Sequence, residues 1–254
     1  MEIREFIEGI EWYKGGSKLN YSVSASKIGG DLLPIWLSKK FDKDPSSQIG
    51  VAYQGSAFHR GMEEEMNDKK KLTGTRYDVE IGGAKTLSNG WLVTGTADVL
   101  DNTLSNIHDY KTTSNSGYNN MKKAARDKTS QLAIQGGTLQ WLNDTTGDFF
   151  AEVFIRDWKP WRKDHPASAY QQLPVETYAG NQIEIFLLAK TDELQGYLDA
   201  DTPPPECDNV MWMIYEGNKI KLKCEYYCDY KSNCPSYAKN TNHLAVTKTK
   251  IQGW

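Results

Sequence analysis

The chain has 254 residues and a formal net charge of −3, and its share of hydrophobic and charged residues is close to the globular average. This length allows one large hydrophobic core, or one core with an appended lobe. No run approaches the roughly 18 apolar residues of a membrane span, so we expect a cytoplasmic protein without a membrane partner. The small negative charge argues against a protein that coats nucleic acid. It does not exclude an enzyme with acidic metal ligands.

The first third of the chain predicts helices. Residues 21–41 begin with serines that can cap a helix and continue into an apolar stretch, which predicts short helical pieces. Residues 50–71 predict the next helix from their apolar spacing. Within it, His59 and Glu63 are four residues apart and therefore share a face.

Three strands are predicted after this helix. The runs are rich in β-branched and aromatic residues, and the turn signals Gly82-Gly83, Asn89-Gly90 and Asp101-Asn102 separate them. The predicted strands are residues 76–81, 91–100 and 104–112. Their short connections predict a meander, in which consecutive strands are neighbours.

The second half of the chain continues with alternating elements. Residues 121–142 predict a helix and residues 149–155 a strand. Residues 157–174 contain tryptophans and prolines without a clear period, which predicts a long loop or insertion. Residues 182–198 predict an amphipathic helix, and the three prolines at 203–205 end it.

These elements together predict an α/β fold with a mixed central sheet flanked by helices, in the order α-β-β-β-α-β. We expect one domain over residues 1–254. Its parts are an N-terminal helical region (1–48), a core (49–156), a loop and helix insertion (157–202) and a cysteine-rich C-terminal element (203–254).

The pattern with the most chemical content is a pair of short acidic motifs on two of the predicted strands. Gly95-Thr96-Ala97-Asp98 is followed eleven residues later by Asp109-Tyr110-Lys111. Adjacent strands present alternate side chains on one face, so Asp98, Asp109 and Lys111 can converge if the register is right. The two-residue step from Asp109 to Lys111 lets both side chains point the same way.

Two carboxylates at one point predict a site for Mg²⁺ or Mn²⁺, which prefer oxygen ligands. The peptide carbonyl of Tyr110 offers a further oxygen. Such a cation lowers the pKa of a bound water, and Lys111 would orient that water and help to stabilise its deprotonated form. The Asp-x-Lys tripeptide alone is weak support, because it arises by chance about once in a chain of this length.

The order of these motifs resembles the RecB-type branch of the PD-(D/E)XK nuclease superfamily, over about residues 55–135. In that family a Gly-x-x-x-His motif on the first core helix supplies a metal ligand, and His59 stands in that place. The resemblance implies that Asp98 and Asp109 are the motif carboxylates and that Lys111 is the catalytic lysine. Taken apart from the other motifs, His59 would be interpreted more simply as a structural or surface histidine.

The same family carries Gln-x-x-x-Tyr on the helix after the strands. Gln131 meets the first position, which implies a catalytic contact to the phosphate or to the metal's water. Gln135 replaces the tyrosine, so its role is open. Glu63 and Gln135 are candidates for contacts behind the metal ligands. For Glu63, a solvated charge in the run of residues 63–65 is an equally good interpretation.

Four cysteines, Cys207, Cys224, Cys228 and Cys234, cluster in the last fifth of the chain. In an intracellular protein this favours a metal site over disulfides, and four thiolates fit zinc or a [4Fe-4S] cluster equally well. The CRISPR-adaptation nuclease and AddB-type relatives carry an iron-sulfur cluster closed by three C-terminal cysteines, which favours the cluster here. Those relatives take their first cysteine from near the N-terminus, so Cys207 would have to substitute for it. Reduced or disulfide-bonded cysteines are the third alternative.

The resemblance implies a stand-alone, metal-dependent DNA exonuclease on a restriction-endonuclease-like core, similar to small phage-encoded members of the family. Its products would carry 5′-phosphates, and its role would be in DNA recombination, repair or turnover. The expected partner is linear DNA, at its ends or as single strands, together with a second copy of the chain or a recombination protein.

Two other functions remain open. One is a catalytically silent nucleic-acid-binding or assembly subunit, in which the cysteine site is structural. The other is a cysteine-rich zinc-binding interaction module, in which the Asp-x-Lys tripeptide is accidental.

Overall fold

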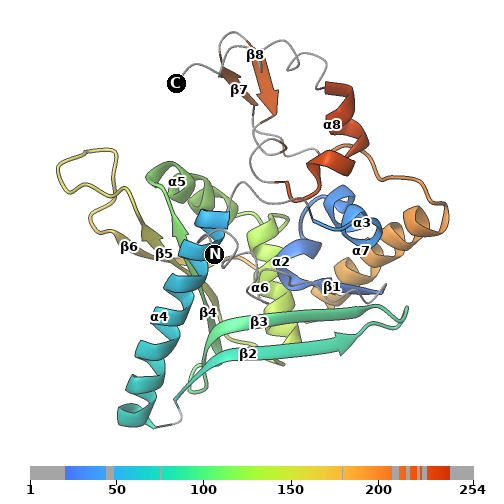
Figure 1. Cartoon of the computed structure of the whole chain (residues 1–254). Coiled ribbons are helices and arrows are strands. Elements are labelled where there is room, and N and C mark those ends of the chain that lie inside the picture. The colour runs from blue at the N-terminus through green and yellow to red at the C-terminus, as the bar shows by residue number, and fades with distance from the viewer. Residues whose placement is uncertain are drawn as a thin grey trace, which may run out of the picture. The chain divides into compact units, whose positions relative to one another are not determined.

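The structure, a computed structural model, describes residues 21–43, 49–74, 76–178, 180–207, 212–215, 218–221, 224 and 228–240 (Figure 1). The chain divides into two compact units. The first, here called the sheet unit, comprises residues 19–30 and 51–193. The second, here called the cysteine unit, contains the described residues within 31–50 and 194–254.

A mixed sheet forms the centre of the sheet unit. Its strands are β1 (Ser22–Ser24), β2 (Tyr77–Thr86), β3 (Leu92–Asp101), β4 (Asn106–Thr113), β5 (Phe149–Ile155) and β6 (Tyr170–Val175). The hydrogen-bonded order is β1-β3-β4-β5-β6, and β2 also pairs with β3. The β1–β3 and β4–β5 pairs are parallel, and the others in this sheet are antiparallel. The coarse prediction of an α/β fold with a central sheet flanked by helices is confirmed.

The longest pairing in the sheet is the hairpin of β2 and β3. It turns at Asn89-Gly90, where Gly90 has φ +86°, and Trp91 is 1% exposed beside the turn. The prediction of a turn at Gly82-Gly83 is wrong, because both glycines lie inside β2 and pair with Thr96 and Gly95. A Cβ on Gly83 would lie 2.8 Å from the Leu142 Cβ. Gly83 therefore lets the helix that carries Leu142 approach the hairpin, whereas a Cβ on Gly82 would have no atom within 4 Å.

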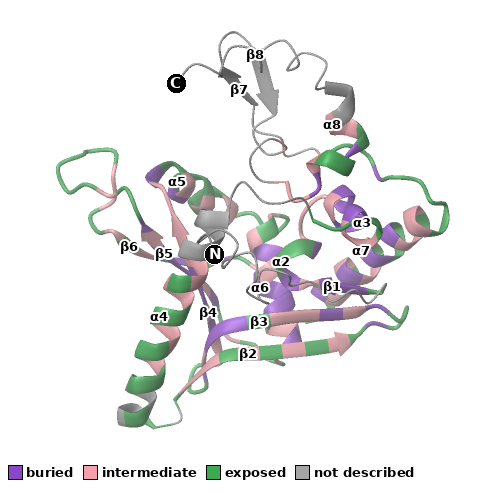
Figure 2. Ribbon diagram, in the orientation of Figure 1, coloured by how far each residue is buried: buried purple, intermediate pink, exposed green. Residues whose placement is uncertain are grey.

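Helices cover both faces of this sheet. The long helix α4 (Ile49–Thr73) lies against one face, where the Phe58 ring contacts those of Tyr110 and Phe154 (Figure 1). Helix α6 (Gln131–Leu142) lies against the other, since a Cβ on Gly136 would meet the Phe149 ring. Phe149 and Phe154 are an odd number of residues apart on β5 and point to opposite faces. The most buried strand segments lie between these two layers (Figure 2).

The predicted helix over residues 121–142 is two helices in the structure, α5 (Asn115–Ala124) and α6. The break occurs because Ser130 caps α6: its hydroxyl accepts a hydrogen bond from the Ala133 amide at 3.1 Å. The prediction of a loop over residues 157–174 is also wrong at its end, where β6 begins at Tyr170. Pairing with β5 makes this segment a strand despite its irregular sequence.

One edge of β3 is shared by two strands. β1 pairs with residues 92–94 of β3, and β4 pairs with residues 99–101. In the described pairings, residues 95–98 have β2 on one side and neither β1 nor β4 on the other. This gap contains the Gly-x-x-Asp motif and is the place where groups from both faces of the sheet can meet.

The cysteine unit is built around helix α3 (Leu32–Lys40) and the end of helix α7 (Asn181–Asp199). The Trp36 indole donates to the Tyr197 carbonyl at 3.3 Å, and Lys40 pairs with Asp201 at 2.6 Å. The unit also contains the residues that follow α3 as far as residue 43, strands β7 (Trp212–Tyr215) and β8 (Asn218–Lys221), the short 3-10 helix η3 (Lys231–Asn233) and helix α8 (Pro235–Asn240). Among the helices that the structure describes, none has a stretch both long and apolar enough to span a membrane.

Candidate metal centre

The two acidic motifs come together at the gap in β3. Asp98 is 7% exposed and its Oδ2 accepts a hydrogen bond from the Tyr110 amide at 2.5 Å. This side-chain bond stands where a backbone ladder bond would otherwise join β3 to β4. Asp109 is 3% exposed, and its Oδ2 lies 2.5 Å from the Lys111 Nζ. The two strands therefore bring Asp98, Asp109 and Lys111 to one region, as the sequence predicts.

Helix α4 adds a histidine to this region. His59 Nδ1 lies 3.3 Å from Asp98 Oδ1, and the His59 ring has edge contacts with Phe58 and Tyr110. These aromatic contacts orient the imidazole toward β3. The hydrogen bond with Asp98 raises the pKa of His59, while burial opposes the rise. The placement of His59 beside the first motif carboxylate agrees with the sequence-based expectation.

Strand β2 contributes a carboxylate that the sequence interpretation did not include. Ligand atoms of His59, Glu80 and Asp98 lie within 4.8 Å of one another, and within the described parts of the chain this is the one such group of three. Burial, followed by the charges of Asp98 and Glu63, raises the pKa of Glu80. The signal that could have found Glu80 is hairpin register counted from Asn89-Gly90. Ending the strand at Gly82-Gly83 concealed it.

The second motif carboxylate, Asp109, has different surroundings at its two oxygens. Asp109 Oδ1 accepts a hydrogen bond from Gln135 Nε2 at 3.1 Å. Its Oδ2 is buried and lies 2.5 Å from the Lys111 ammonium, which is the charged group that offsets it. Burial raises the pKa of Asp109; Lys111 lowers it and Asp98 raises it further.

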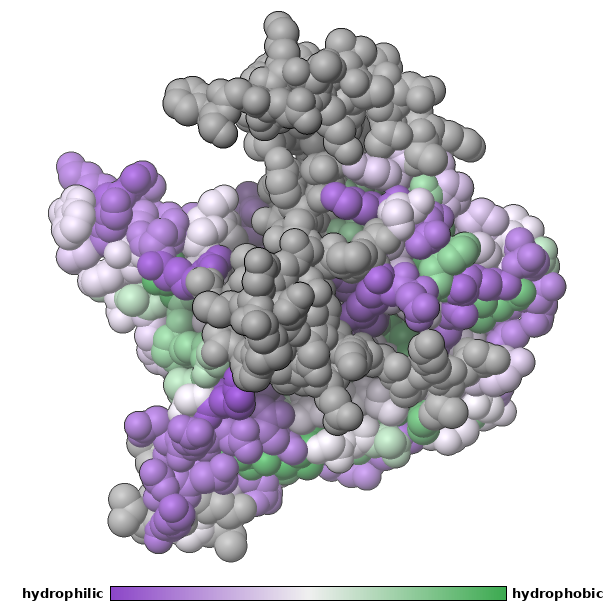
Figure 3. Space-filling model, in the orientation of Figure 1, coloured by the Kyte–Doolittle hydropathy of each residue, from purple (hydrophilic) through white to green (hydrophobic). Residues whose placement is uncertain are grey.

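The two glutamines of α6 have different positions. Gln135 contacts the motif carboxylate Asp109, whereas Gln131 Nε2 donates to the Ser26 carbonyl at 2.7 Å and so ties α6 to helix α2 (Ala25–Ile28). The catalytic role expected of Gln131 stays a prediction, and so does that of the Tyr110 carbonyl as a ligand. Glu63 is half-buried and its charge acts on Glu80, while Glu64 and Glu65 are exposed. Hydrophilic side chains gather along this part of α4 (Figure 3).

A groove of about 590 Å³ borders the metal centre. It is lined by small or hydroxyl-bearing residues and by the side of α6: Ser24, Ala25, Ser26, Gly82, Gly83, Ala84, Thr94, Gly95, Thr96, Gln135 and Leu139. No charged residue is among them. Gln135 joins the groove to the centre, because it lines the groove and also contacts Asp109. A chain lying in this groove would therefore lead to the acidic group.

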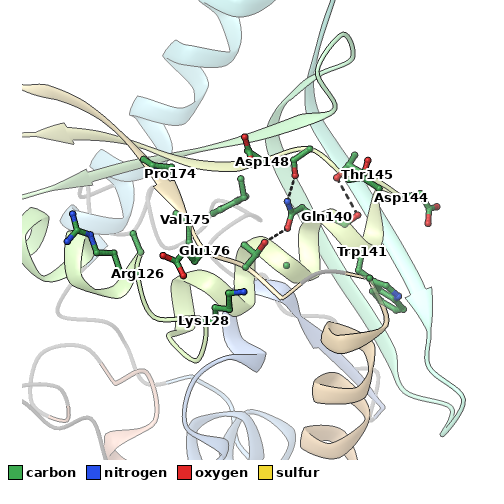
Figure 4. A pocket seen from close by; sticks show the side chains of 17 residues that line it. Arg126, Lys128, Gln140, Trp141, Asp144, Thr145, Asp148, Pro174, Val175 and Glu176 are labelled. Atoms are coloured by element: carbon green, nitrogen blue, oxygen red, sulfur yellow. Dashed lines mark hydrogen bonds between the residues drawn. The ribbon is translucent and has the colours of Figure 1, made fainter.

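A larger pocket, of about 810 Å³, lies near the C-terminal end of α6 (Figure 4). Gln140 braces it, donating to the Gly147 carbonyl at 2.6 Å and accepting from the Thr177 hydroxyl at 2.7 Å. Arg126 and Lys128 line one side. The pocket shares no lining residue with the acidic group, so its size does not make it the reactive site.

A second cluster of ionisable groups lies on the α4 face of the sheet. Glu152 accepts hydrogen bonds from Tyr170 and Gln172 and contacts His108 Nδ1 at 2.6 Å. Burial would raise the pKa of Glu152, but these three contacts hold it below its ordinary value. Both carboxylate oxygens are satisfied, so this cluster is explained as a buried structural network.

The four cysteines belong to the cysteine unit. Cys234 is buried and the other three are partly exposed, and none of the four forms a disulfide bond in the described residues. Burial raises the pKa of the Cys228 thiol, and the nearby Cys234 and Cys224 raise it further. Lys43, just beyond α3, pairs with Asp229 at 3.3 Å. The last three cysteines therefore lie near one another, next to a segment from the N-terminal part of the chain.

Comparison with known proteins bears on the fold alone. No protein-family model matches the sequence, and no curated protein matches it. Among solved structures, the one titled "Crystal structure of SSO0001" is similar, with a TM-score of 0.52 and 14% sequence identity. The match covers 93% of this chain and 98% of that chain. The likeness therefore extends over almost the whole of both chains.

Proposed function

We propose that the protein is a metal-dependent DNA nuclease with a restriction-endonuclease-like core, of the RecB-type PD-(D/E)XK branch. The observation that carries this proposal is the convergence of His59, Asp98, Asp109 and Lys111 at the gap in β3. A buried pair of carboxylates without balancing charge is costly in a protein interior. One lysine and one histidine offset it only in part, so the arrangement is suited to a cation.

The side chains present fit Mg²⁺ or Mn²⁺. The oxygen donors are carboxylates, which both ions prefer, and the Oδ2 of Asp109 is a buried acceptor beside the Lys111 ammonium. The imidazole of His59 favours Mn²⁺ over Mg²⁺, because nitrogen ligands suit transition ions better. When bound, the ion would supply Lewis-acid activation of the phosphate and of a water molecule.

The protein's own groups have separate tasks in the proposed reaction. Asp98 and Asp109 hold the ion, and the Tyr110 amide fixes the carboxylate of Asp98. Lys111 is 27% exposed at its side chain, so its ammonium can reach both Asp109 and a substrate phosphate. It would orient the attacking water and offset charge that develops on the phosphate. Gln135 keeps Asp109 in place.

Linear DNA, at its ends or as a single strand, is the proposed substrate. The neutral groove beside the centre supports this, since its hydroxyl groups can donate hydrogen bonds to phosphate oxygens and Gly82 leaves open space beside the strand. Exonuclease action, 5′-phosphate products and a role in recombination or repair come from the family resemblance. The alternative is a silent DNA-binding or assembly subunit.

We also propose that the cysteine unit binds a metal group, either a [4Fe-4S] cluster or zinc. The proximity of Cys224, Cys228 and Cys234 supports it. A buried thiol with a raised pKa becomes a thiolate readily only beside a cation, which a metal would provide. Iron with acid-labile sulfide in the purified protein would identify the cluster; zinc alone would identify the other site.

Replacing Lys111 by alanine tests the proposed chemistry. Lys111→Ala should reduce the rate of DNA cleavage by about 100-fold or more, because a positioned proton donor or acceptor contributes that much. DNA binding and the folded state should persist. The assay is single-turnover cleavage of labelled linear DNA with Mn²⁺, alongside binding of the same DNA in Ca²⁺.

The matched control is Lys122→Ala, which removes an equal charge from the exposed surface of α5. It should cleave within about 3-fold of the wild type, as surface charges contribute little. Cleavage by Lys111→Ala at the control rate would contradict the proposed mechanism.

A further inference from the structure

We propose that Glu80 of β2 is a ligand of the metal ion, together with His59 and Asp98. This inference rests on the proposed function, because it concerns the same centre. It adds a carboxylate from a third strand, β2, to the carboxylates of Asp98 on β3 and Asp109 on β4. The ligands would then come from α4, β2 and β3, three elements that meet only in the folded chain.

The first argument is strand register. Val79 pairs with Val99 and Ile81 pairs with Ala97, so Glu80 and Asp98 are the residues between these two pairs, although they form no ladder pair themselves. Glu80 has φ +52°, which takes it out of the regular strand geometry. Its carboxylate and that of Asp98 are nevertheless close, because their ligand atoms lie within 4.8 Å, and two like charges at this distance repel unless a cation lies between them.

The second argument is the position of the ligand atoms. Oxygens of Glu80 and Asp98 and a nitrogen of His59 lie within 4.8 Å of one another. An ion equidistant from three such atoms lies at a distance suited to ligands of about 2.0–2.6 Å after small side-chain adjustments. Glu80 is exposed, so its carboxylate can move toward an ion and an ion can enter from solvent.

The third argument comes from outside this group of three. Asp109 is buried, with 4% of its side chain exposed, and its Oδ2 lies 2.5 Å from the Lys111 ammonium. The charges of Asp98 and His59 both act on Asp109, and the charge of Asp109 acts on Glu80. The carboxylates of Glu80, Asp98 and Asp109 therefore outnumber Lys111 and His59, and a bound cation would offset the remaining negative charge.

Glu64 provides a matched control for charge without ligation. It is an exposed residue of α4 and is not part of the group of ligand atoms. Glu64→Gln and Glu80→Gln remove the same charge and retain nearly the same shape. A ligand and a surface charge should therefore respond differently.

The experiment measures Mn²⁺ binding to full-length, EDTA-treated protein without DNA, from the electron paramagnetic resonance signal of free Mn²⁺. Glu80→Gln should weaken binding by about 10-fold or more, since even residues behind metal ligands change affinity by that factor. Glu64→Gln should stay within about 3-fold of the wild type. Circular dichroism and melting temperature establish that each variant is folded.

Equal affinity of Glu80→Gln and the wild type would overturn the inference, as would equal losses in the two glutamine variants. The proposed function would survive either result if the wild type cleaved DNA with Mn²⁺. Conversely, Glu80-dependent Mn²⁺ binding by a protein that cuts no DNA would support the inference and overturn the function. A wild type that binds no Mn²⁺ would overturn both.

Discussion

Glu80 has a backbone conformation that its residue type disfavours. Its φ is +52° in the middle of β2, where a side chain with a Cβ is strained. Strain of this kind costs about 1–3 kcal/mol and persists only when the surrounding structure enforces it. Here the flanking pairs with β3 enforce it. The carboxylate lies within 4.8 Å of the ligand atoms of Asp98 and His59, so a gain in metal binding would explain why strain is tolerated there.

Glycine at this position should relieve the strain. Glu80→Gly is expected to stabilise the metal-free protein by about 1 kcal/mol, because glycine adopts positive φ freely and one carboxylate is lost beside Asp98. The measurement is urea unfolding in EDTA. Thr86→Gly is the control: it lies in the same strand without a positive φ, and should lose about 0.5–1 kcal/mol. Loss of stability in both variants would show that Glu80 is not strained.

The elements with regular patterns were the predictable ones. The predicted strand at residues 149–155 has the same bounds as β5, and the helix predicted over 182–198 matches α7 within one residue at each end. β1 and β6 were missed, because both become strands only through pairing with distant segments. Local sequence does not encode such pairing.

The candidate site also divides into residues that local sequence predicts and residues whose place depends on packing between distant elements. The proximity of Asp98 and Asp109 could be inferred from the order of two adjacent strands, and His59 from its motif. The contact of Gln135 with Asp109 could not, because it depends on how α6 is rotated against the sheet. Glu80 required the correct length of β2, which the glycine pair at positions 82 and 83 obscured.

Replacing either of two helical glycines by alanine should change the stability of the protein, in opposite directions. In α6, a Cβ on Gly136 would lie 2.5 Å from the Phe149 ring, which is 1% exposed and has no room to move. Gly136→Ala should therefore destabilise the protein by about 1–3 kcal/mol. In α4, a Cβ on Gly61 would have no atom within 4 Å, so Gly61→Ala should stabilise it by up to about 1 kcal/mol.

Chemical denaturation of both variants measures this difference. A stabilised Gly136→Ala protein would show that α6 does not pack on β5 as closely as described. That result would also weaken the placement of Gln135 beside Asp109, since the same helix carries both residues.

At the scale of the whole molecule, the proposed chemistry and the cysteines belong to different units. His59, Glu80, Asp98, Asp109 and Lys111 all lie in the sheet unit, while the four cysteines lie in the cysteine unit. The N-terminal part of the chain contributes to both units: β1 and α2 belong to the sheet unit, and α3 belongs to the cysteine unit. A metal group on the cysteines would therefore stabilise the unit that contains them.

The central claim is that the acidic centre hydrolyses DNA with a bound metal ion. Its most direct test is incubation of the anaerobically purified wild-type protein with end-labelled linear DNA, single-stranded and duplex, and with closed circular DNA. Each is examined with Mn²⁺, with Mg²⁺ and with EDTA. We predict metal-dependent loss of linear DNA with circles spared, which would also reveal the direction of cleavage. Intact DNA in every condition would contradict the claim and favour a silent DNA-binding subunit.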